Sequence, residues 1–68
     1  MSAIVSADGK NIGSEYEIVG GAFAWSVVVR NGTGIEFRRG RHHNEQTAQQ
    51  DMLAGALELA PNAILEVL

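Results

Sequence analysis

The sequence predicts an α+β domain: a three-stranded antiparallel meander, one crossover helix and a fourth strand. Apolar residues alternate with period 2 in stretches up to residue 39, and from residue 45 they recur with a period of about 3.6. Asp, Asn and Gly cluster at residues 8–11 and 31–34, which is typical of turns between strands. A right-handed crossover through the helix would place the fourth predicted strand parallel to the first. We therefore expect the sheet order 3-2-1-4, counting predicted strands along the chain.

The first predicted strand, residues 3–7, is a short β-favouring run that ends at the turn sequence Asp-Gly-Lys-Asn. Residues 11–15 are polar and contain glycine, which predicts an exposed loop. Residues 16–19 are compatible with extended backbone. The Gly20-Gly21 pair that follows permits a bend, a bulge or a close approach of backbone.

Residues 22–30 carry the strongest strand pattern. Phe23 and Trp25 occupy the same face, at the spacing of core or interface residues. After the hairpin sequence Asn-Gly-Thr-Gly, residues 35–39 form the third predicted strand, with Ile35 and Phe37 on one face. Polar residues on its other face predict that one side of this strand is wet.

Residues 45–60 predict the helix, with Asn44 as N-cap and Thr47 as the alternative. Its apolar stripe consists of Ala48, Met52, Ala56, Leu59 and Ala60, with Leu53 and Leu57 beside them. Pro61 ends the helix, and residues 63–68 predict the last strand. That strand is apolar on both faces apart from Glu66, and an uncovered edge of this kind is expected to pair with a partner.

Composition narrows the class of protein. The chain has 68 residues, 46% of them hydrophobic and 19% charged, which predicts one folded domain and excludes an intrinsically disordered chain. A core this small is marginal, and the absence of cysteine excludes disulfides and cysteine-based zinc sites as support. We therefore expect self-association or a partner. The net charge of −3 argues against non-specific coating of DNA but leaves room for a local basic patch.

Targeting features are missing from the sequence. No apolar run approaches the roughly 20 residues that cross a bilayer, which predicts that no segment spans a membrane. The first five residues lack the basic and apolar regions of a signal peptide, so we expect a cytoplasmic protein.

Three stretches, in this order, resemble the ribonuclease H family: residues 5–9 (VSADG), 20–28 (GGAFAWSVV) and 47–57 (TAQQDMLAGAL). The resemblance implies that residues 1–68 form a single RNase H-like half-domain. It also implies hydrolysis of an RNA–DNA hybrid with Mg²⁺, the metal being held by the catalytic carboxylates Asp8 and Asp51. Asp51 stands where the family usually has glutamate, and it is one methylene shorter.

The family's third carboxylate follows the fourth strand, about where this sequence ends at Leu68. With two carboxylates, we expect a catalytically incomplete protein that acts as a self-associating binding or assembly module. A homodimer or another protein partner would be held by the edge of residues 63–68 or by the open sheet face. The alternative is a magnesium-dependent, RNase H-type nuclease whose missing half comes from another chain or from the dimer.

Four neighbouring residues form the most asymmetric charged segment: Arg38, Arg39, Arg41 and His42. They could bind the phosphates of nucleic acid together with the start of the helix, or they could form a solvated edge paired with Glu36 and Glu45. A zinc site at His42 and His43 lacks a third ligand. Both aspartates also have ordinary interpretations, Asp8 as a turn residue and Asp51 as a solvated helix position.

Overall fold

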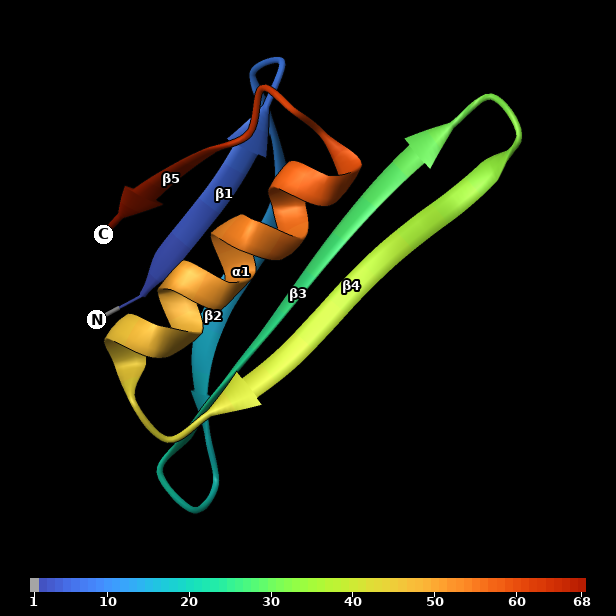
Figure 1. The fold of residues 1–68 in the computed structure, drawn as a ribbon. Helices are drawn as coiled ribbons and strands as arrows, with labels where there is room; N and C mark the ends of the chain where they lie inside the picture. Colours follow the sequence, from blue (N-terminus) through green and yellow to red (C-terminus); the bar gives the residue numbers. More distant parts are fainter. Residues whose placement is uncertain (1) are drawn as a thin grey trace.

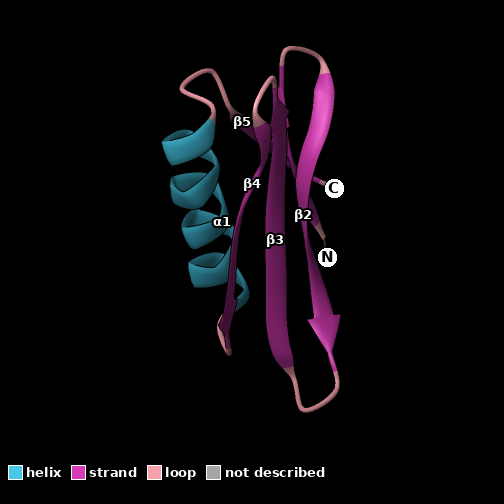
Figure 2. Cartoon of the chain, turned by 90° about the vertical axis from the view of Figure 1, so that its right-hand side faces the viewer, coloured by secondary structure: helices cyan, strands magenta, loops and turns pink. Residues whose placement is uncertain are grey.

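The computed structural model describes residues 2–68, in which five strands form one sheet and a single helix packs against one of its faces (Figures 1 and 2). The elements are β1 (Ala3–Ala7), β2 (Lys10–Ile18), β3 (Ala22–Asn31), β4 (Gly34–His42), α1 (Glu45–Leu59) and β5 (Ile64–Val67). The strand order is β4-β3-β2-β1-β5, and every neighbouring pair is antiparallel. Among the described residues, no helix is both long and apolar enough to cross a membrane.

The predicted sheet order 3-2-1-4 with a parallel last strand is wrong. Residues 10–18, predicted as a loop followed by a short extended piece, form the complete strand β2 between β1 and β3. Each tight hairpin reverses the chain, so one additional strand before the helix reverses the direction of β5. The last strand does lie beside β1, but it is antiparallel, with Ala3 opposite Val67.

Glycine in β2 permits a close approach of strands and does not interrupt the strand. Gly13 pairs with Val27 of β3, and a Cβ at position 13 would lie 2.5 Å from the Ser26 carbonyl oxygen. At the start of β2, Asp8 and Gly9 both have positive φ, 54° and 76°. This is the backbone of a two-residue hairpin turn, and it connects Ala7 directly to its partner Lys10.

The predicted helix and its N-cap are confirmed. The Asn44 side-chain oxygen accepts a hydrogen bond from the Thr47 backbone N–H at 3.0 Å. The buried side of α1 carries small residues around Met52, and Gly55 lies directly against the Trp25 ring. Trp25 is only 5% exposed, so its predicted place in the core is also confirmed.

Candidate functional site

The sheet face opposite α1 is not covered by any described element, as the edge-on view in Figure 2 shows. Directly opposed residues on neighbouring strands project to the same face. The register therefore places one set of β2, β3 and β4 residues on this side, which we call the open face: Ser14, Tyr16, Ile18, Ala22, Ala24, Ser26, Val28, Arg30, Ile35, Phe37, Arg39 and Arg41. Large side chains among them are about half exposed, including Tyr16 at 50% and Phe37 at 57%.

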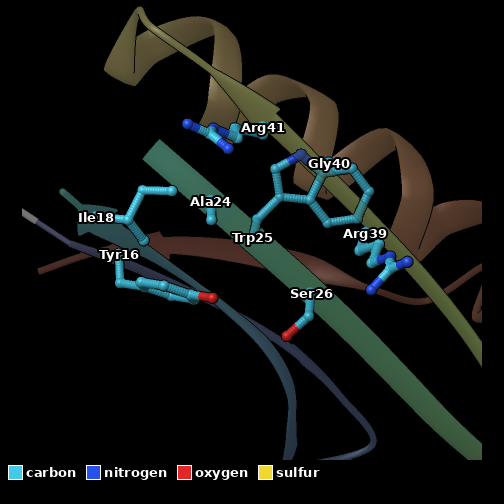
Figure 3. Close-up of a pocket in the computed structure, with 8 residues that line it drawn as sticks. All are labelled: Tyr16, Ile18, Ala24, Trp25, Ser26, Arg39, Gly40 and Arg41. Carbon is cyan, nitrogen blue, oxygen red and sulfur yellow. The ribbon is translucent and has the colours of Figure 1, made fainter. Parts of the chain in front are cut away.

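The open face contains a hollow of about 620 Å³ between β2, β3 and β4 (Figure 3). Tyr16 and Ser26 lie on one side of it in the view, and the side chains of Arg39 and Arg41 extend from β4 on the other. Trp25 and Gly40 also contribute to its lining, but the indole ring turns toward the helix. The hollow therefore combines an aromatic hydroxyl, a serine hydroxyl and two guanidinium groups.

Charge is divided between the two sides of the sheet. Of the described strand residues, the open side carries Arg30, Arg39 and Arg41 with one carboxylate, Glu66, at the far edge on β5. The helix side carries the other carboxylates of the strands and helix: Glu15, Glu17, Glu36, Glu45, Asp51 and Glu58. A chain that is acidic overall thus presents a locally basic face.

The predicted phosphate-binding residues do not share one surface. Arg39 and Arg41 lie on the open face, opposite Ser26 and Ala24. Arg38 pairs with Val27 and projects to the helix side, where its Nε is 3.9 Å from a Glu58 carboxylate oxygen. Adjacent strand residues point to opposite faces, so a cluster that is continuous in sequence is split by the sheet.

His42, the fourth predicted residue, contacts the helix. Its Nε2 is 2.8 Å from Asp51 Oδ2, and the Trp25 indole N–H donates to the same oxygen at 3.0 Å. Gly40 makes room for this contact, since a Cβ there would lie 2.4 Å from the indole nitrogen. Asp51 therefore joins β3 and β4 to α1, a role that periodicity could not reveal because it depends on residues 26 and 9 positions away.

The two predicted metal ligands have separate partners. Asp8 lies in the β1–β2 turn, where its carboxylate accepts a hydrogen bond from the Asn62 side chain after α1. Asp51 is bound to residues of β3 and β4, and β2 separates those strands from β1. Within residues 2–68 there is no group of three or more His, Cys, Asp or Glu side chains arranged to hold a metal ion. The catalytic and metal-binding roles of Asp8 and Asp51 stay predictions.

One ionisable residue escaped the sequence analysis altogether. Glu15 lies on the helix side of β2, between Ala3 and Trp25, and is only 1% exposed. Neither carboxylate oxygen has a hydrogen-bond partner among the described residues. Burial raises the pKa of Glu15; the nearby Gln49 amide opposes this shift in part, and the charge of Glu45 adds to it. The only sequence signal for a buried residue at this position was the period-2 alternation around it, and the polar residues in the range 10–15 obscured that alternation.

No protein-family model, curated protein or solved structure matches the chain. The resemblance to ribonuclease H therefore stays a prediction that rests on three short stretches.

Proposed function

We propose that the chain is a small nucleic-acid-binding module whose open face takes single-stranded DNA or RNA. The observation that carries this proposal is the separation of charge, because the face opposite the helix has three arginines and only one distant carboxylate. The partner that this surface fits is anionic. Exposed aromatic side chains on the same face add a preference for a ligand with flat, apolar groups.

The residue types match the two parts of a nucleotide. Guanidinium groups form paired, charge-assisted hydrogen bonds with phosphate oxygens. Arg39 and Arg41 occupy alternate positions of one strand, so their Cα atoms are about 7 Å apart and form a row along β4. Tyr16 on β2 and Phe37 on β4 offer ring faces on which unpaired bases can stack.

A single strand fits this surface better than a duplex does. Bases of a duplex are read by elements that enter a groove, whereas the open face is the side of a sheet. Unpaired bases can spread over a sheet and stack on aromatic residues while arginines bind the backbone. A second copy docked through the same face would bring its own arginines against Arg30, Arg39 and Arg41, which opposes that arrangement.

Fluorescence anisotropy with a labelled oligothymidylate tests the proposal. The doubly substituted variant Arg39→Ala, Arg41→Ala should weaken binding about tenfold or more at low salt. Its salt dependence should also become shallower, by about 0.7 in the logarithmic slope for each lost phosphate contact. The single variants Arg39→Ala and Arg41→Ala are measured as well, and Arg38→Ala is their matched control, because it removes one positive charge from the same segment but on the helix side.

Two outcomes would contradict the proposal. One is a loss of affinity in Arg38→Ala equal to that in Arg39→Ala or Arg41→Ala alone, which would mean that net charge and not the open face governs binding. The other is equal affinity for the labelled single strand and for a duplex of the same length, which would leave no role for base stacking on Tyr16 and Phe37.

A further inference from the structure

Among residues 2–68, β4 and β5 each pair with one neighbouring strand only, and these two edges of the sheet differ in character. The β4 edge is nine residues long and carries Arg38, Arg39 and Arg41, and cations of this kind discourage pairing with another strand. The β5 edge has no cation, and Glu66 is its single charged residue. Apolar side chains are exposed along it, with Ile64 at 64% and Val67 at 50%. Of the two edges, β5 is the one that lacks protection.

The hydrogen-bond pattern shows which backbone groups of β5 are free. Leu68 donates its N–H to the Ser2 carbonyl at 2.8 Å, continuing the register that pairs Ala3 with Val67. Hydrogen-bonded and non-hydrogen-bonded pairs alternate along an antiparallel ladder. The pairs of β1 with Val67 and Leu65 are therefore non-hydrogen-bonded pairs. The N–H and C=O groups of these two residues point away from β1, toward the free edge.

We propose that β5 pairs with β5 of a second copy, antiparallel and across a two-fold axis. Two identical edges close on themselves in this arrangement, whereas β4 against β4 opposes like charges and β5 against β4 generates an open chain of subunits. The outward groups require Leu65 and Val67 to form the hydrogen-bonded pairs, and charge decides between the registers that allow this. Leu65 opposes its own copy, which sets Glu66 against Ile64; the next register would set Glu66 against Glu66.

A two-fold axis perpendicular to the sheet keeps each face on the same side. The product is one continuous ten-stranded sheet, with both helices on one side and both open faces on the other. Association through β5 does not depend on the proposed nucleic-acid binding, since none of the open-face arginines takes part in it. Either proposal can fail without the other.

Sedimentation velocity over a concentration series tests association through β5. The protein should change from monomer to dimer as its concentration rises. Val67→Pro removes an outward N–H without removing a bond to β1, so this variant should stay monomeric where the parent is dimeric. Val67→Ala is the matched control, because it shortens the same side chain but keeps the N–H, and it should still dimerise.

A second variant tests the register and does not depend on proline being tolerated. The chain has no cysteine, and residues opposed in a hydrogen-bonded pair have Cα atoms about 5.5 Å apart, within reach of a disulfide. Leu65→Cys should therefore form a covalent dimer on oxidation, while Ile35→Cys in the distant β3–β4 hairpin should not. A parent chain that is monomeric at every concentration, a dimeric Val67→Pro, or particles that grow without limit would each overturn the proposal.

Discussion

The two faces of the sheet differ in the exposure of their apolar side chains and in the size of most of them. The core under α1 is small, and half of its eight buried members are alanine: Ala3, Ala48, Ala56 and Ala63, beside Val5, Trp25, Val27 and Met52. Larger apolar residues such as Ile35 and Phe37 lie on the open face, more than half exposed. The helix can therefore lie close to the sheet, but few large contacts hold it there. Stability depends on the covered face, and the open face is free to serve binding.

Trp25→Ala should be the most damaging change. It removes the largest side chain of the covered face and the indole N–H that donates to Asp51. Loss of a buried tryptophan costs about 3–5 kcal/mol, which is most of the stability expected of a domain this small. Urea unfolding followed by far-ultraviolet circular dichroism should find the variant largely unfolded without denaturant.

Trp25→Phe is the control for that change, since it keeps a ring but removes the N–H. We expect a loss smaller than that of alanine, including about 1 kcal/mol for the missing hydrogen bond. Equal stability of Trp25→Ala and the parent chain would contradict the view that this face holds the fold together.

Strand β2, which the sequence did not predict, shows why the sheet was harder to predict than helix α1. Period 3.6, an asparagine cap and a proline stop specify α1 from neighbouring residues alone. Strand β2 contains Gly13 and the buried Glu15. In the sequence, a glycine and a charged residue at these positions are typical of an exposed loop. Gly13 is explained only by the Ser26 carbonyl across the ladder. One unrecognised strand was enough to reverse the predicted direction of β5.

Glu15→Gln should have the second largest effect, and in the stabilising direction. The folded state raises the pKa of this carboxyl, so below the pKa of the unfolded chain both states are protonated and ionisation costs nothing. As the pH rises through the folded pKa, the buried carboxyl group becomes charged, and the folded state loses stability relative to the unfolded chain. The variant should therefore gain on the order of 1 kcal/mol near neutral pH, and the gain should vanish in acid.

Urea midpoints measured from about pH 4 upward would display this difference. Glu17→Gln is the matched control, because Glu17 belongs to the same strand but is exposed. A gain for Glu15→Gln that is independent of pH would mean that side-chain shape, and not ionisation, makes this position costly.

Phe37→Ala should have the smallest effect on stability, below about 0.5 kcal/mol, because the ring is exposed on the open face and covers no core residue. The same variant should weaken binding of the labelled oligothymidylate, since it removes a stacking surface. Unfolding and anisotropy measured on one preparation give both values. A variant that loses stability while keeping affinity would reverse the roles that we assign to the two faces.

The candidate site was predictable in composition but not in arrangement. The arginine-rich segment was visible in the sequence. Because adjacent strand residues point to opposite faces, a strand there already implies that Arg38 lies on one face and Arg39 on the other, with Arg41 on the same face as Arg39. The side that each would take depended on where the helix packs. The contact of Asp51 with His42 and Trp25 needed the whole fold, because it joins three elements.

The division between the faces also has an optical consequence. The chain has one tryptophan and one tyrosine, and they lie on opposite sides of the sheet. Trp25 touches Asp51 and Gly55 of α1, so its emission responds to separation of the helix from the sheet. Tyr16 lines the open hollow, so quenching of its signal responds to whatever enters there. The molecule thus carries two intrinsic reporters, one packed under the helix and one on the open face, and neither needs a label.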